Sequence, residues 1–300
     1  MTAFITRRRL LIAAAASGLA TALPADLARW EGSALGAHTQ ILMDHPDSAR
    51  LIAVARGEIE RLERVFSLYR GESELSRLNR DGRLSAPSFE LLDCLAQARL
   101  AHRATEWRFD PTVQPLWVVL AKAHAAGRTP APDAVQTARA RIGFDAVSFD
   151  AAEIRLGAGQ ALTLNGIAQG YIADRVARRL KAEGLRDVLV DTGEIAAHGA
   201  PAGHGGWPVS VANTNRRLIL HDRALATSAS LGTVLDAEGT QGHILRPVQT
   251  APVAPRQVSV SAESAALADA LSTALCLAEN EATALRLLSG VAGARLEVFA

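Results

Sequence analysis

The 300-residue sequence contains few cysteines and lysines and few aromatic residues. Cysteine occurs only as Cys94 and Cys276, both in apolar stretches with helical spacing. Neither lies near the His and Asp residues that mark a nucleophilic cysteine, so we expect both to be small buried residues. An oxidising compartment would permit a disulfide between them. Lysine is limited to Lys122 and Lys181, and net charge is +1 at pH 7. With no basic run beyond the first ten residues, we expect no nucleic-acid partner.

The sequence also lacks an apolar run long enough to span a bilayer. The run at residues 10–23 is too short, but it follows Arg7, Arg8 and Arg9 and contains the small residues 20–22. This pattern predicts a cleaved signal peptide at residues 1–22 for the twin-arginine export machinery, with an uncleaved anchor as the alternative. We therefore expect residues 23–300 to form one mature domain in the periplasm.

Hydrophobic periodicity predicts helices in the first half of the chain and a stretch rich in short strands in the second. This order is typical of an α+β fold rather than of a repeated β-α-β unit. We expect helices at 48–66, from Ser85 onward, and at 113–126, 131–142, 167–183, 265–277 and 282–288. Strands are expected at 146–149, 153–156, 161–164, 187–191, 195–198, 207–211, 217–220, 224–227, 242–245, 256–261 and 294–299.

Residues 162–175, LTLNGIAQGYIADR, combine an apolar strand, a glycine turn and a helix start. Such a turn directs the backbone N–H groups of residues 166–168 toward whatever lies in front of it, which suits a phosphate. Similar turns occur in many α/β proteins, so this pattern alone is weak evidence for a phosphate site.

A second polar group lies near the end of the chain. Asp269, Ser272 and Thr273 are three and four residues apart on an expected helix, so they share one face. Their oxygens are hard ligands that favour Mg²⁺, or Ca²⁺, over zinc. On these residues alone, a capped or solvated polar face of a terminal helix is the favoured explanation.

Four segments in this order resemble the ApbE family of FAD:protein FMN transferases: residues 66–79, 109–116, 162–175 and 268–275. The resemblance covers nearly the whole chain after the leader. It implies an α+β, T-fold-related domain with mixed and antiparallel sheets packed against helices. It also implies FAD as the substrate and a Mg²⁺-dependent transfer of FMN to a Ser or Thr hydroxyl of an acceptor protein, with release of AMP.

The resemblance assigns roles to the metal and base residues. It implies a cation held by Asp269, Thr273 and a backbone carbonyl at Gly166, with Ser272 where some members have a second aspartate. His243 matches the family's candidate general base, which suits an imidazole near neutral pH. A structural histidine is the alternative, and the loop after Ile244 departs from the family pattern at Arg246.

Further residues match positions that contact the flavin nucleotide. The resemblance implies that Tyr69 stacks on the flavin ring and that the loop of Arg108, Phe109 and Asp110 contacts the cofactor; Asp110 equally suits capping of the next helix. The remaining matches are Ile244, beside His243, then Leu35, and finally Thr163, Asn165 and Gln169 around the glycine turn. At Leu35 and in this turn the family more often has other residues.

Alternatives to protein flavinylation stay open. The same fold and metal could use water as acceptor, which would make an FAD pyrophosphatase, or the altered residues could leave a flavin-binding assembly factor without catalysis. For the transferase, we expect the acceptor to be an exported flavoprotein domain of a membrane redox complex. The leader is similar to that of the family branch linked to nitrous oxide reductase maturation.

Overall fold

The computed structural model describes residues 17–19, 27–248 and 253–300. Most of the expected signal peptide therefore lies outside the described residues. The described part of it, β1 (Ser17–Leu19), pairs antiparallel with β9. No helix in the described ranges combines the length and apolarity needed to cross a membrane.

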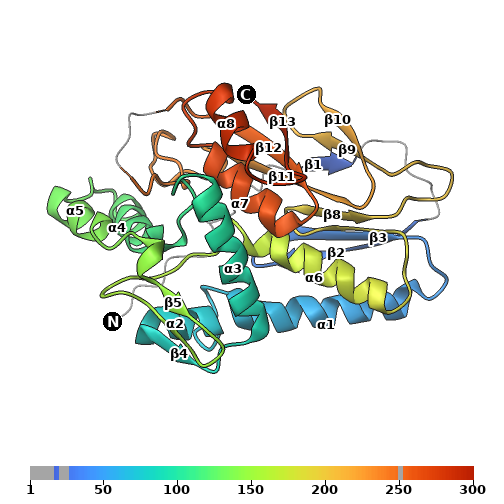
Figure 1. The fold of residues 1–300 in the computed structure, drawn as a ribbon, viewed down its shortest axis with the longest axis horizontal. Helices are drawn as coiled ribbons and strands as arrows, with labels where there is room; N and C mark the ends of the chain where they lie inside the picture. Colours follow the sequence, from blue (N-terminus) through green and yellow to red (C-terminus); the bar gives the residue numbers. More distant parts are fainter. Residues whose placement is uncertain (1–16, 20–26, 249–252) are drawn as a thin grey trace.

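A seven-stranded antiparallel sheet is the centre of the molecule, and Figure 1 shows helices running across one of its faces. Its spatial order, β13-β12-β11-β8-β7-β3-β2, places the first strands of the chain at one edge and the last strand at the other. The strands are β2 (Ala28–Ala34), β3 (Ala37–Met43), β7 (Val188–Asp191), β8 (Ile195–His198), β11 (Arg223–Ala229), β12 (Gln257–Ala262) and β13 (Arg295–Phe299).

The covered face buries the main core. Apolar positions of α1 (Ser48–Phe66) and α6 (Ala168–Ala182) pack against Ile41, Val188 and Val190 of the sheet. α7 (Ala265–Leu275) lies beside α6 and packs on β11 and β12, where α8 (Glu281–Leu288) completes a second cluster. Burying these side chains supplies most of the stability of such a domain.

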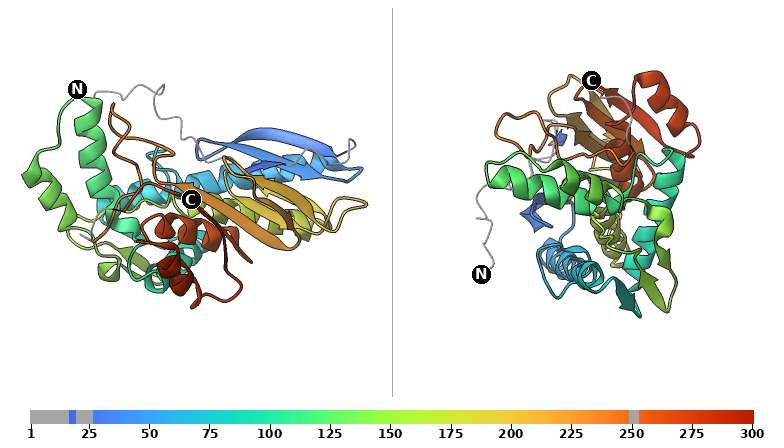
Figure 2. Two further views of the ribbon diagram at one scale, coloured as in Figure 1. Left: turned by 90° about the horizontal axis from the view of Figure 1, so that it is seen from above. Right: turned by 90° about the vertical axis from the view of Figure 1, so that its left-hand side faces the viewer.

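The opposite face of the sheet carries β9 (Trp207–Val211) and β10 (Arg217–Leu220), which with β1 form a three-stranded sheet. Trp207 is fully buried there against sheet residues such as Leu189 and Leu225. Figure 2 shows the layers edge on, with the helices on one side of the strands.

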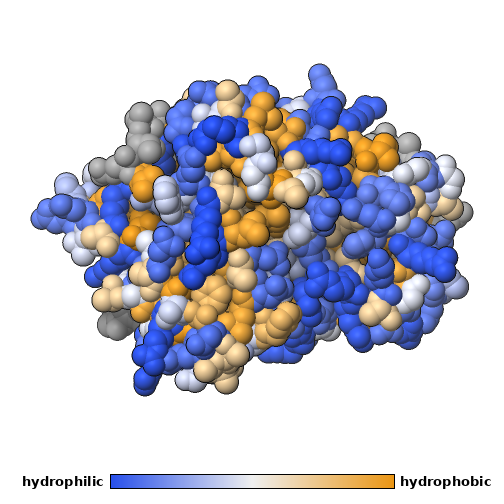
Figure 3. Space-filling view, in the orientation of Figure 1, coloured by the Kyte–Doolittle hydropathy of each residue, from blue (hydrophilic) through white to orange (hydrophobic). Residues whose placement is uncertain are grey.

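The remaining helices stand at one end of the sheet. α2 (Glu74–Asp81), α3 (Phe89–Ala104), α4 (Gln114–Ala125) and α5 (Pro132–Arg139) lie there with the 3-10 turns Pro111–Val113 and Phe144–Ala146. A small sheet of β4 (Arg83–Ser85), β5 (Ser148–Phe149) and β6 (Glu153–Arg155) joins them. Apolar residues gather around α3 on the face shown in Figure 3, and Phe89 and Leu100 of this helix are exposed.

The α+β class is confirmed, but several elements differ from those expected. The hairpin of β2 and β3 was not foreseen, so strands precede the first helix. Its two-residue turn is made by Leu35 and Gly36, with φ of 49° and 87°, the conformation that matches strand twist. Ser85 lies in β4 instead of capping a helix; Ser88 caps α3 by accepting the N–H of Leu91.

Two expected strands are absent from the described chain, and each has a physical reason. At 161–164 the backbone of Leu162 bonds the side chain of Asn79 at 2.7 and 2.8 Å, so an amide takes the place of a neighbouring strand. At 242–245 only Gly242 forms a bridge, with Val234, inside a loop that folds back on itself. The two cysteines are free and buried, as expected for small core residues.

Candidate functional site

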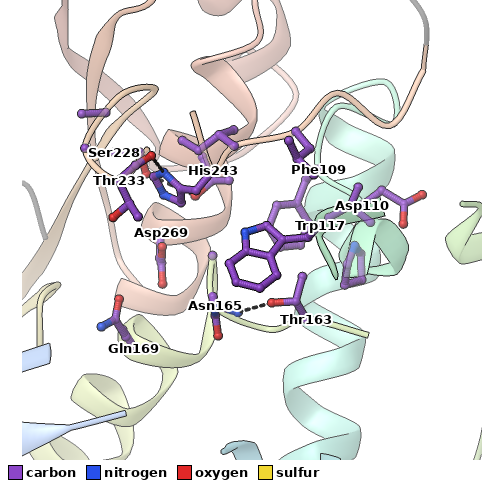
Figure 4. Close-up of a pocket in the computed structure, with 18 of the residues that line it drawn as sticks. Phe109, Asp110, Trp117, Thr163, Asn165, Gln169, Ser228, Thr233, His243 and Asp269 are labelled. Atoms are coloured by element: carbon purple, nitrogen blue, oxygen red, sulfur yellow. Dashed lines mark hydrogen bonds between the residues drawn. The ribbon is translucent and has the colours of Figure 1, made fainter. Parts of the chain in front are cut away.

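One cavity of about 160 Å³ lies where α6, α7, β11 and the loop after it meet the residues around the first 3-10 turn (Figure 4). All of the site residues expected from the sequence except Ser272 line it. They are Leu35, Tyr69, Arg108, Phe109, Asp110, Thr163, Asn165, Gly166, Gln169, His243, Ile244, Asp269 and Thr273. Six separate segments of the chain therefore converge on one pocket.

The floor of the cavity is the close contact between α6 and α7. A Cβ at Gly170 would lie 2.2 Å from the carbonyl oxygen of Ala265, so only glycine lets the helices approach this closely. As a result, the Gly170 N–H reaches across to the Asp269 carboxylate at 3.3 Å. The Asp269 side chain is thus fixed by backbone rather than by a flexible partner.

Asp269 is a buried acid that contacts no basic side chain within the described part of the chain. It is 2% exposed, and burial raises its pKa to about 8, although the hydrogen bond from Gly170 opposes that rise. A buried carboxylate is stable as an anion only when a positive charge or several donors offset it. Asp269 therefore has the chemistry of a cation ligand.

Hydroxyl groups surround this carboxylate. The Thr273 Oγ1 lies 3.1 Å from the Ser228 Oγ, and a Cβ at Gly166 would lie 3.0 Å from the same Thr273 oxygen. Glycine at 166 therefore leaves the turn backbone close to Thr273. Among the described residues no three His, Cys, Asp or Glu side chains are close enough to share a metal, so hydroxyl or carbonyl ligands would be needed.

Ser272 lies behind this wall rather than in it. Its hydroxyl donates to the Asp269 carbonyl at 3.0 Å and is 2.8 Å from the Ser228 Oγ. It is fully buried and is absent from the cavity lining. The structure thus separates Ser272 from the other expected metal ligands and gives it contacts that hold Ser228 and α7 together.

His243 occupies the opposite wall, in the loop after β11. Its backbone N–H and its Nδ1 lie 3.0 and 3.1 Å from the carbonyl oxygen of Thr233. Because a carbonyl only accepts, this contact places the proton of a neutral ring on Nδ1 and leaves Nε2 as an acceptor. Burial lowers the pKa of His243, which keeps the ring neutral near pH 7.

Phe109 and Trp117 form the apolar side of the cavity, shown in Figure 4 near Thr163. Asp110, next in the chain, accepts from the N–H and the hydroxyl of Thr112 at 2.8 and 2.5 Å and from the Phe144 N–H at 3.1 Å. Capping of the 3-10 turn is therefore confirmed for Asp110. A direct contact of its carboxylate with a nucleotide stays a prediction.

The rim combines a charge and an aromatic ring. Arg108 donates to both oxygens of Glu279 at 2.9 and 3.1 Å, so its guanidinium is already engaged. Tyr69 is 66% exposed, and its position follows from Ser67, whose hydroxyl accepts the Tyr69 N–H at 3.1 Å. An exposed ring at the cavity edge is available for stacking on a planar ligand.

The expectation that the N–H groups of residues 166–168 face a phosphate is wrong for two of the three. Ile167 and Ala168 both donate to the carbonyl oxygen of Leu164, at 3.0 and 2.7 Å. The turn closes on itself, because these donors satisfy the carbonyl that ends the preceding segment. What remains for an anion is the partial positive charge of the α6 N-terminus.

The sequence reading missed several lining residues, chiefly Glu194, Thr227, Ser228 and Thr233. Glu194 follows the glycine turn after β7 and is 6% exposed. One oxygen accepts the Thr227 N–H at 3.0 Å, and burial, followed by the Asp269 charge, raises its pKa well above the ordinary value. The signal available was the glycine turn at residues 191–194, which resembles the family turn that closes the site, but no role was expected for Glu194 itself.

Comparisons with known proteins agree with this arrangement. The sequence profile of the ApbE family matches residues 35–295. The FAD:protein FMN transferase of Haemophilus influenzae is 26% identical over 267 residues, which cover 79% of this chain and 77% of that protein. The same-named enzyme of Chlamydia trachomatis is 28% identical over 250 residues, 77% of this chain and 78% of that protein.

The fold is also similar to the crystal structure of the ApbE protein of Thermotoga maritima. The TM-score is 0.79 over 90% of this chain and 93% of that chain, at 23% identity. At this identity the likeness concerns the fold alone. It matches the described arrangement of antiparallel sheets and helices.

Proposed function

This chain belongs to the ApbE family, and from that premise we propose that it transfers FMN from FAD to a hydroxyl group of an acceptor protein. AMP would be the leaving group, and Mg²⁺ the cation that supports the reaction. The observation that carries this proposal is the pairing, across one cavity, of the buried Asp269 carboxylate with the neutral His243 ring.

The residues present fit a divalent cation. The Asp269 carboxylate and the Thr273 hydroxyl supply hard oxygens, and the backbone of Gly166 lies beside them. When bound, Mg²⁺ supplies charge that offsets the developing negative charge on phosphate oxygens. This fit explains why a carboxylate without a basic partner is retained in the cavity wall.

His243 fits the task of accepting the hydroxyl proton of the acceptor. The Thr233 carbonyl fixes the ring orientation and the tautomer, and Nε2 then carries the lone pair. As the hydroxyl oxygen bonds to the FMN-side phosphorus, the bond to the AMP oxygen breaks and the hydroxyl proton passes to Nε2. Phe109 and Trp117 restrict water in the cavity, and Tyr69 at the rim suits the flavin ring.

Mass spectrometry tests this proposal. We would incubate the chain with FAD, Mg²⁺ and a candidate acceptor domain that carries exposed Ser and Thr residues. The expected result is an added mass of one FMN residue on the acceptor, lost when EDTA replaces Mg²⁺. Intact acceptor together with free FMN and AMP would instead indicate the pyrophosphatase, and bound, intact FAD would indicate a binding factor.

We also propose, from the sequence alone, that residues 1–22 are a twin-arginine signal peptide and that the mature protein acts in the periplasm. The acceptor would then be an exported domain of a membrane redox complex. Removing residues 1–22 would also remove β1 from the small sheet. In cell fractionation, an Arg7→Lys/Arg8→Lys variant should remain in the cytoplasm. Unchanged export of this variant would contradict the twin-arginine route.

A further inference from the structure

We propose that Glu194 is a second carboxylate of the cation site. This inference rests on the proposed function only for the presence of a cation. Glu194 lies in the turn between β7 and β8, whereas Asp269 lies in α7, so two separate elements each place an acid in the wall of one cavity.

The contacts of Glu194 leave one oxygen available. Its Oε2 accepts the Thr227 N–H at 3.0 Å, and no hydrogen bond of Oε1 is found within the described ranges. The Glu194 side chain is 6% exposed. Asp269 is similar, because its Oδ2 accepts the Gly170 N–H, and its Oδ1 accepts no hydrogen bond from the described residues.

No positive side chain offsets these two acids. Among the residues that line the cavity, only Arg108 and His243 are basic. Arg108 is engaged by Glu279 and Glu106, and His243 is held neutral by burial and by its contact with Thr233. Two buried carboxyl groups that repel each other, without a basic partner, form an environment that a divalent cation would stabilise.

The neighbouring hydroxyls connect the two acids. Thr227, whose N–H holds Glu194, is followed by Ser228, whose hydroxyl lies 3.1 Å from the Thr273 Oγ1. The Glu194 carboxylate is thus joined through β11 to the helix face that carries Asp269 and Thr273. This placement compensates for Ser272, which offers no charge and lies outside the cavity lining.

The variant Glu194→Gln tests this proposal, since the amide oxygen can still accept the Thr227 N–H while the charge is lost. We would titrate the purified variant with Mn²⁺, with and without FAD, and follow free Mn²⁺ by electron paramagnetic resonance. The Kd for Mn²⁺ should rise at least tenfold.

Asp191→Asn is the matched control. Asp191 is half-buried and accepts the Gly193 N–H at 2.9 Å, but it does not line the cavity. Its Mn²⁺ affinity should stay within twofold of the wild type. Glu194→Asp, which keeps the charge on a shorter side chain, should lie between Glu194→Gln and the wild type.

The outcomes separate this inference from the proposed function. If Glu194→Gln binds Mn²⁺ within twofold of the wild type, or if the wild type binds no Mn²⁺ with or without FAD, the inference is overturned. If Mn²⁺ binding depends on Glu194 but no acceptor is modified by mass spectrometry, the cation site stands and the transferase proposal fails.

Discussion

The two walls of the cavity are built differently. The α6–α7 wall consists of helices in close contact, with Asp269 fixed by the backbone of Gly170. The wall of His243 is a loop after β11 with one isolated bridge, between Val234 and Gly242. His243 bonds the Thr233 carbonyl, and Leu245 packs against residues of α4. The comparison indicates that the charge-bearing side is rigid before any ligand binds, whereas the base is carried by an element with fewer constraints.

The largest effect should come from the rigid wall. Asp269→Asn keeps an oxygen for the Gly170 N–H but removes the charge, so FMN transfer should fall about a thousandfold or more. Isothermal titration calorimetry should show that binding of Mg²⁺ is lost. Asp81→Asn, an exposed change at the end of α2, is the control and should leave both measurements unchanged.

In the absence of metal, Asp269→Asn should be more stable than the wild type. The pKa of Asp269 is raised from 3.8 to about 8 in the folded state. Its contribution to stability is therefore fully present below about pH 4 and is lost as pH rises toward 8. Thermal unfolding in EDTA should show an advantage of Asp269→Asn that grows over this interval. An advantage that shrinks with pH would contradict the assignment of a buried, unbalanced acid.

The loop wall should show a smaller effect that is confined to the chemical step. His243→Asn can still donate to the Thr233 carbonyl but has no Nε2, so kcat should fall about 100-fold to 1,000-fold. FAD affinity, measured by flavin fluorescence in the presence of Mg²⁺, should change little. At saturating Mg²⁺ the wild-type rate should fall only below about pH 6.5, because burial lowers the pKa of His243 from that value. Loss of FAD binding in this variant would show that the loop is structural.

The rigidity of the α6–α7 contact can be tested by its glycine. Gly170→Ala places a Cβ 2.2 Å from the Ala265 carbonyl oxygen, and we expect a loss of about 3 kcal/mol in the free energy of unfolding. Gly57→Ala in α1 meets nothing within 4 Å and should stabilise the protein by up to about 1 kcal/mol. Urea unfolding of both variants gives the comparison. If both variants changed the free energy of unfolding equally, the stability of the protein would not require the close approach of α6 and α7.

The difference between the walls also explains which features could be predicted from sequence. Helix periodicity locates α1 with its observed bounds and places Asp269 and Thr273 on one helix face. The strand expected at 242–245 is wrong because local apolar residues cannot reveal that the segment folds back on Thr233. The strand expected at 161–164 is wrong for a similar reason, because the backbone of Leu162 bonds the side chain of Asn79, 83 residues earlier.

Glu194 was missed for a related reason. Its carboxylate belongs to the site only because β8 pairs with β11, and the residues that form this pairing are separated by a long stretch of chain. Sequence patterns report burial and local geometry, and the resemblance to the ApbE family supplied the remaining site residues. Neither source gives the charge balance of a cavity, which depends on all the elements that surround it.

The ratio of AMP released to acceptor modified tests the central claim most directly. In a reaction with FAD, Mg²⁺ and an acceptor domain, both products would be measured at the same time points, AMP by chromatography and flavinylated acceptor by intact mass. The account predicts one AMP for each FMN attached, with little AMP when the acceptor is omitted. AMP formed at the same rate without acceptor, and no attached FMN, would contradict it.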